Sequence, residues 1–185
     1  MTRRAGAVTT GIAGAAIALM AIAPPSGAAE PAATVEREQI RALIVAEARE
    51  MDFPVALALA VAHAESYFDP EAESHKGARG VMQIMPATSV GEYGIQPDRL
   101  WEPRINVRLG IHFLKRLIER YRGRTDLALS YYNGGSAVGD PPNAHVIPAT
   151  AAYVRKVRWL HRHYQRELWS GGFDKWMRAK QPRAS

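Results

Sequence analysis

Cysteine is absent from the 185 residues of this chain. Without a thiol, the protein can form no disulfide, no thiolate metal site and no cysteine nucleophile. His63 and Glu65 form a His-x-Glu pair that opens a zinc deaminase signature, but that signature also needs cysteines. No second histidine stands at the spacing of a zinc-binding helix. We therefore predict neither a metal site nor a cofactor.

A strong excess of charge is also lacking. The chain has 24 Lys and Arg against 18 Asp and Glu. Arg3 and Arg4 lie in an N-terminal leader without acidic residues, so the remainder carries 22 − 18 = +4. The last predicted helix is rich in Arg, Lys and His, which fits a solvated face or contact with an anionic polymer. The balance is too weak to indicate nucleic acid as a partner.

Alternation of polar and apolar residues with a period of two is absent as well, so no strand is expected. Apolar residues instead recur at helical spacing, most clearly in residues 102–123, where Ile105, Leu109, Phe113 and Leu117 repeat every four positions. The fold class is therefore predicted to be all-α. Helices are expected at residues 34–51, 54–66, 86–94, 102–123, 125–135 and 149–168.

The N-terminus has the layout of a secretory signal peptide. Arg3 and Arg4 precede a charge-free apolar run at residues 5–23, and Pro24-Pro25 and small residues follow it. Cleavage after Ala28 or Ala29 is expected, and the alternative is a retained membrane anchor. We expect a periplasmic or secreted protein with no stable membrane insertion after cleavage.

Glu65 is the first candidate catalytic residue. Residues 57–64 are apolar nearly all round except for His63, which is typical of a buried helix. A carboxylate at the C-terminal end of such a helix is partly desolvated and faces the negative end of the helix dipole, and both effects raise its pKa. A raised pKa suits a general acid near neutral pH. The alternative is a helix-end residue that points to water.

Four motifs in order resemble the soluble lytic transglycosylase family, the lysozyme-like enzymes that cut bacterial peptidoglycan. They are Glu65-Ser66, Gly80-Val81-Met82-Gln83, Tyr131-Tyr132-Asn133 and Tyr153-Val154. Asn106 and Gly110 also match the middle helix of the family. The resemblance implies a lysozyme-like all-α fold with little or no β structure. Together with the signal peptide expected at 1–28, the resemblance, which covers roughly residues 40–168, divides the chain into a linker and N-terminal helix (29–52), a catalytic domain (53–168) and a C-terminal tail (169–185).

The resemblance also implies roles for single residues. Glu65 would protonate the oxygen between N-acetylmuramic acid and N-acetylglucosamine. It would then take the proton of the muramic acid 6-hydroxyl, which gives a 1,6-anhydro sugar. Met82 and Tyr153 could instead be core residues, and Asn133 could only serve a turn. The substrate-binding residues implied by the family are Ser66, Met82, Gln83, Tyr132, Asn133 and Tyr153.

A second carboxylate is missing from the stretch where a lysozyme-like fold is expected to offer one. Residues 76–91 contain no Asp or Glu, and Gln83 is an amide that cannot act as a base. Asp69, Glu71 and Glu73 remain as candidates, so a hydrolytic muramidase is the nearest alternative. Two departures from the family pattern stand out. Ala149 replaces a glutamate, which should alter one sugar subsite, and Gly134 replaces an alanine, which should loosen a turn.

The expected partner is the glycan strand of peptidoglycan. An alternative from another class is a cell-wall-binding or secretion-assembly protein whose activity is incidental. An intact Glu65 argues against a pure binder. Partnership with secretion or conjugation machinery is left open by the sequence.

Overall fold

The computed structural model of the protein describes residues 31–171. The predicted signal peptide and residues 172–185 of the predicted tail lie outside the described residues. The described part contains no strand, only isolated bridges that join Arg79 to Glu73 and to Ile84. The all-α prediction is therefore confirmed. Its helices are α1 (Pro31–Glu50), α2 (Val55–Ser66), α3 (Pro86–Tyr93), α4 (Pro103–Arg120), α5 (Thr125–Gly134) and α6 (Ala151–Trp169), with short 3-10 helices η1 (Pro97–Trp101), η2 (Gly135–Val138) and η3 (Pro148–Thr150).

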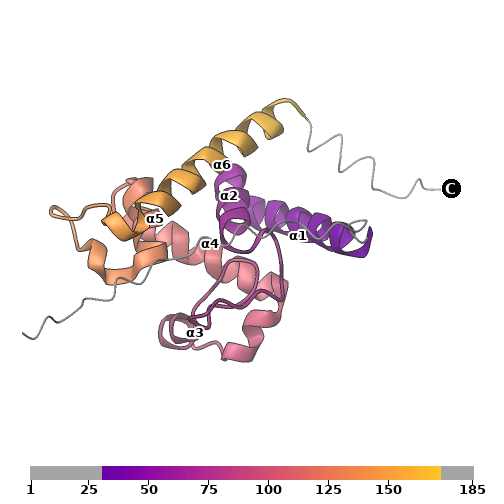
Figure 1. Cartoon of the computed structure of the whole chain (residues 1–185), viewed down its shortest axis with the longest axis horizontal. Helices are drawn as coiled ribbons and strands as arrows, with labels where there is room; N and C mark the ends of the chain where they lie inside the picture. Colours follow the sequence, from indigo (N-terminus) through magenta and orange to yellow (C-terminus); the bar gives the residue numbers. More distant parts are fainter. Residues whose placement is uncertain (1–30, 172–185) are drawn as a thin grey trace, which may run out of the picture.

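Helix α2 is the centre of the core. Every residue from Ala56 to Ala62 is buried, as expected for a helix that is apolar on all sides. Helices α1 and α6 pack against α2, and α4 and α5 complete the bundle (Figure 1). This arrangement leaves the C-terminal end of α2, with Glu65, next to the long loop that leads to α3.

Two local details differ from the sequence prediction. Helix α1 begins at Pro31, three residues before the start expected at residue 34. Proline is well tolerated in a first helical turn, where its missing N–H has no partner in any case. The short helix η1 was not predicted, because its one buried anchor, Leu100, gives no periodic pattern.

An ion-pair cluster joins α1 to α4. The carboxylate of Glu47 is 1% exposed and lies 2.6 Å from Arg104 Nε and 2.6 Å from Arg108 Nη1. Arg108 Nη1 also pairs with Glu50, whose Oε1 lies 2.8 Å away. The arginine head groups stay partly exposed, which limits the desolvation cost to Glu47.

Candidate active site

Glu65 sits on the last turn of α2 and lines a pocket of about 370 Å³. Helix α2 ends one residue later, and Tyr67 takes the left-handed conformation (φ 57°). The pocket draws on α2, the loop between α2 and α3, and the end of α5. Besides Glu65, it is lined by Ser74, His75, Lys76, Ala78, Gln83, Met85, Tyr132 and Asn133.

The carboxyl group of Glu65 has the raised pKa that the sequence predicted. Burial raises its pKa, a hydrogen bond from Tyr153 and the charge of Lys156 lower it, and the net result is a rise from 4.5 to about 7. Tyr153 donates its hydroxyl to Glu65 Oε1 at 2.5 Å. Lys156 Nζ donates to the Ala64 carbonyl at 2.9 Å, so it occupies one of the unpaired carbonyls at the end of α2. Glu65 is therefore partly protonated near neutral pH, and the hydroxyl of Tyr153 is placed to stabilise its ionised form.

Ser66 faces the backbone rather than the pocket. Its Oγ donates to the Val81 carbonyl at 2.8 Å and accepts from the Asp69 N–H at 3.1 Å. Ser66 is not among the residues that line the Glu65 pocket. The hydroxyl of Ser66 therefore fastens the Gly80–Gln83 segment to the end of α2, and its contact with a sugar stays a prediction.

Met82 is a core residue, and the prediction that it packs on a sugar face is wrong for this structure. Its side chain is 0% exposed. It fits against Gly110, where an added Cβ would meet Met82 side-chain atoms at 2.6 Å. The sequence alone could not decide between these roles, because methionine serves equally well as core filler and as an apolar contact.

Asn106 fixes the backbone of the same segment from inside the protein. The residue is fully buried, and its Oδ1 accepts from Met82 N at 2.7 Å. Its Nδ2 donates to the carbonyls of Arg79 at 2.7 Å and Leu100 at 3.0 Å. Gly80 (φ +71°) must be glycine here, because a Cβ would meet Asn106 Nδ2 at 2.6 Å.

Gln83 lines the pocket with a backbone conformation that is unusual for a non-glycine residue (φ 49°). Its amide nitrogen donates to the carbonyls of Ala72 at 2.9 Å and Gly80 at 3.0 Å. The amide is therefore oriented by the loop, and its oxygen is the atom it can offer to a ligand.

Three aromatic or amide residues predicted for the site lie around Glu65. Tyr132 lines the pocket and donates its hydroxyl to the Met82 carbonyl at 2.8 Å. Asn133 lines the pocket and is exposed. Tyr153 reaches Glu65 from the first turn of α6. Tyr131, by contrast, packs its ring against Phe113 and Tyr121, in keeping with its expected core role.

No second carboxylate lines the Glu65 pocket among the described residues. Of the three candidates, Asp69 accepts the N–H of Glu71 at 2.9 Å, and Glu73 pairs with Arg79 at 3.4 Å. Glu71 is exposed. Nor do residues 31–171 contain a group of three or more side chains that could bind a metal ion.

Sequence reasoning missed part of this pocket. Ser74, His75 and Lys76 line it, although no motif marked them. Their only sequence signal is that they directly precede Gly77 and the Gly80 motif. Lys156 lowers the pKa of Glu65, but nothing in the sequence distinguishes it from the other charges of a basic helix.

The two departures from the family pattern have different consequences. Gly134 does not loosen a turn, because a Cβ there would meet Thr150 Cγ2 at 2.7 Å and Ile147 Cδ1 at 2.9 Å. Glycine instead allows close packing between the end of α5 and η3. Ala149 is exposed on η3 and presents no polar group.

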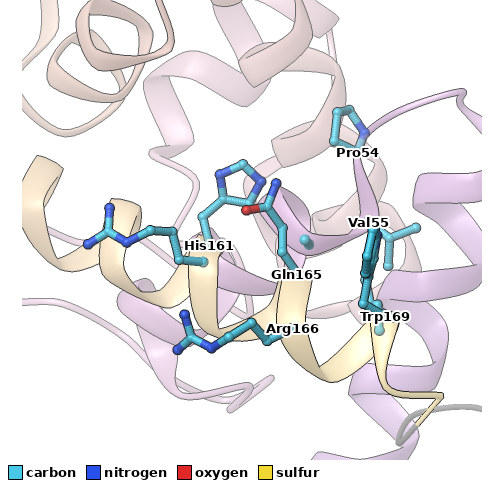
Figure 2. Close-up of a pocket in the computed structure, with 9 residues that line it drawn as sticks. Pro54, Val55, His161, Gln165, Arg166 and Trp169 are labelled. Atoms are coloured by element: carbon cyan, nitrogen blue, oxygen red, sulfur yellow. The ribbon is translucent and has the colours of Figure 1, made fainter.

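A second and larger groove lies elsewhere, between the start of α2 and the last turns of α6. It has a volume of about 610 Å³ and is lined by Pro54 and Val55 on one side and by His161, Gln165 and Trp169 on the other (Figure 2). None of the predicted site residues lines it, and it contains no carboxylate.

Comparison with known proteins agrees with this architecture. The profile of the family described as "Transglycosylase SLT domain" matches residues 42–141, and the chain belongs to that family. The solved structure of an inactive glutamate-to-glutamine mutant of the lytic transglycosylase Slt from Pseudomonas aeruginosa aligns with a TM-score of 0.59 and 27% identity, over 69% of this chain and 24% of that one. The 70 kDa soluble lytic transglycosylase from Escherichia coli aligns with a TM-score of 0.58 and 25% identity, over the same shares of the two chains. The lysozyme-like fold class is thereby confirmed.

Curated relatives match over a shorter stretch. The soluble lytic murein transglycosylase of Salmonella typhimurium is 33% identical over 95 residues, which are 47% of this chain and 15% of that protein. The membrane-bound lytic murein transglycosylase F of Desulfosudis oleivorans is 35% identical over 103 residues, which are 52% of this chain and 22% of that protein. The match thus spans less than a quarter of either relative. In residues 31–171, no helix is both long and apolar enough to cross a membrane.

Proposed function

We propose that this protein is a peptidoglycan lytic transglycosylase, a lyase that cleaves the β-1,4 bond between N-acetylmuramic acid and N-acetylglucosamine. The observation that carries the proposal is a single protonatable carboxyl group, Glu65, in a pocket that has no second carboxylate among its described lining residues. Family membership and the names of the relatives support the same reaction.

In the first step Glu65 acts as the general acid. Its neutral carboxyl group delivers a proton to the glycosidic oxygen while the bond from C1 of muramic acid to that oxygen breaks, and the oxygen keeps the electron pair. The carboxylate that remains is stabilised by the hydroxyl of Tyr153. Because this bond favours the ionised form, it contributes more after the proton has left than before.

In the second step the same carboxylate acts as the base. It removes the proton of the 6-hydroxyl, whose oxygen forms a bond to C1, and the product is a 1,6-anhydro sugar. Glu65 is neutral again and no water is consumed. Because the 6-hydroxyl is tethered to the reacting ring, it has the proximity advantage that a free water lacks. Gln83, Tyr132 and Asn133 line the pocket and are the groups proposed to orient the sugar.

A hydrolytic muramidase is the second candidate. A retaining mechanism would need another carboxyl group about 5 Å from the first, and an inverting one would need a carboxyl group farther away with a water between. Glu73 is paired with Arg79 and Asp69 with a backbone N–H, which leaves exposed Glu71 as the most available candidate. A wall-binding protein without activity would have no use for a buried acid of this kind.

Replacement of Glu65 by glutamine tests the function. The amide is nearly isosteric but delivers no proton, so Glu65→Gln should lower the release of fragments from purified sacculi by at least about 100-fold. Glu71→Gln is the matched control and should keep wild-type activity. Mass spectrometry of the wild-type digest should show fragments one water lighter than muramidase products. If folded Glu65→Gln clears a turbid suspension of sacculi at near the wild-type rate, the assignment is rejected. If the fragments end mainly in hydrated muramic acid, the muramidase is favoured.

We also propose that the protein is exported and acts in the periplasm or outside the cell. The basic start, the apolar run at residues 5–23 and the small residues at 26–29 support this. The mature protein should begin at Ala29 or Glu30. N-terminal mass analysis of the envelope fraction checks this, and an intact Met1 there would favour a membrane anchor.

A further inference from the structure

Lys76 and His75 stand at the tip of a tight turn on the edge of the Glu65 pocket. Gly77 N donates to the Ser74 carbonyl at 2.8 Å, which closes a four-residue turn with His75 and Lys76 at its centre. Ser74 N donates to the Ala78 carbonyl at 2.9 Å, and Ala78 N donates to Ser74 Oγ at 3.0 Å. Gly77 supplies the positive φ (+79°). Three hydrogen bonds therefore fix the turn at the pocket.

Both side chains at the tip are exposed, and both residues line the pocket. Lys76 is the one fully cationic side chain among the described residues that line it, and Glu65 is the one acid. Glu73, which lies on the same loop, turns its carboxylate to Arg79 and is not part of the lining. When Glu65 is neutral, as the acid step requires, the pocket therefore carries a net positive charge from Lys76.

The proposed substrate has anionic groups on only one of its two sugars. N-acetylglucosamine is neutral, whereas muramic acid carries a lactyl ether that ends in a carboxylate or in a stem peptide with carboxylates of its own. A cation beside the catalytic acid can therefore distinguish substituted muramic acid from a plain amino sugar.

We propose that Lys76 is a specificity-determining residue that binds a carboxylate of the muramic acid substituent, with His75 as a neighbouring hydrogen-bond donor. The inference rests on the proposed function and deepens it, because it names the part of the substrate that the turn recognises. A point charge on a flexible stem suits a carboxylate whose position varies between peptides. The contribution belongs to substrate binding, since Lys76 takes no part in the proton transfers.

The test compares wild type with Lys76→Ala, Lys76→Glu and Lys76→Arg on soluble peptidoglycan strands. Lys76→Ala should raise KM about fivefold with kcat unchanged within a factor of two, as expected for the loss of one exposed ion pair. Lys76→Glu should raise KM further, and Lys76→Arg should restore it. Addition of salt should raise the KM of wild type more than that of Lys76→Ala. Arg158→Ala on α6, which removes an exposed charge away from the pocket, is the control.

Two substrates identify the carboxylate. If the stem peptide supplies it, the KM difference between wild type and Lys76→Ala should vanish on strands from which an amidase has removed the peptides. If the lactyl group supplies it, the difference should be absent on strands that keep their peptides, where that carboxyl group is an amide, and should appear only on the amidase-treated strands, where it is free. Equal KM values for wild type, Lys76→Ala and Arg158→Ala on both substrates would overturn the inference and leave the proposed function intact. A wild type that cuts neither substrate would overturn the proposed function itself.

Discussion

At the scale of single residues, the proposed chemistry depends on a balance of two effects on the pKa of Glu65. Burial favours its neutral form, which the acid step needs, and Tyr153 favours the ionised form, which the base step needs. Together they give a pKa of about 7. One carboxyl group can then serve both steps, because neither protonation state is strongly disfavoured near neutral pH.

Replacement of Tyr153 tests this balance. The neutral acid starts the reaction, so wild-type kcat/KM should fall as the pH rises through about 7. Tyr153→Phe removes a hydrogen bond that lowers the pKa of Glu65, so the falling limb should move to higher pH. The maximal rate should also drop, because the carboxylate loses its donor. Tyr93→Phe, which removes a hydroxyl outside this pocket, should leave the limb in place.

The pH–rate profile measured on sacculi for the three proteins checks this prediction. A limb at the same pH in wild type and Tyr153→Phe would show that Glu65 does not control it. A limb at lower pH in Tyr153→Phe would contradict the proposed sign of the tyrosine contact.

At this scale, the burial and the raised pKa of Glu65 could be predicted from the sequence more readily than the contacts of its neighbours. Glu65 could be identified because a carboxylate after seven buried residues is chemically out of place. Gln83, Tyr132 and Asn133 lie around its pocket, where the motifs suggested. The sugar contact predicted for Met82 was wrong, because the direction of a side chain in a loop depends on its packing partner. That partner, Gly110, lies on a helix 28 positions farther along the chain.

At the scale of elements, the loop between α2 and α3 carries much of the pocket and has no regular structure of its own to position it. It is fastened from two sides. Ser66 at the end of α2 holds the Val81 carbonyl, and Asn106 on α4 holds the backbone of Arg79 and Met82. The pocket therefore depends on two residues that do not line it.

Asn106→Ala should consequently damage both stability and activity. The buried Met82 N–H and Leu100 carbonyl would lose this partner, and the Arg79 carbonyl would keep only the N–H of Ile84, so the unfolding free energy should fall by about 3 kcal/mol. Urea denaturation measures this change, and the surviving folded fraction should cleave sacculi slowly because Gln83 is no longer oriented.

Asn133→Ala is the matched control, since it removes an exposed amide. Its unfolding free energy should stay within about 0.5 kcal/mol of wild type. An Asn106→Ala variant as stable as Asn133→Ala would mean that the three hydrogen bonds contribute nothing to the loop.

At the scale of the whole molecule, the site combines residues that lie far apart in the sequence. Glu65 and Tyr153 are 88 positions apart, and the family profile ends at residue 141, before Tyr153. Apolar periodicity and the glycine positions together predicted the helices well: Gly94 directly follows α3, and Gly123 lies three residues beyond the end of α4. It could not predict that α6 would pack across α2, because helical spacing defines an apolar face and not the partner of that face.

The last prediction concerns that packing. A protein of residues 31–171 should fold cooperatively and cleave sacculi, whereas residues 31–147, which lack η3 and α6, should not fold. Removal of α6 takes away the buried side chains of Val154, Val157, Leu160 and Tyr164, and it exposes the side of the α2 core that α6 covers. Each such side chain contributes about 1.5–3 kcal/mol when buried, so their combined loss is comparable to the 5–15 kcal/mol that stabilises a typical domain. Thermal unfolding followed by circular dichroism distinguishes the two proteins. A single sharp transition in the shorter protein would mean that α6 is an addition to a core that is complete without it, and Tyr153 would then reach Glu65 from outside the folding unit.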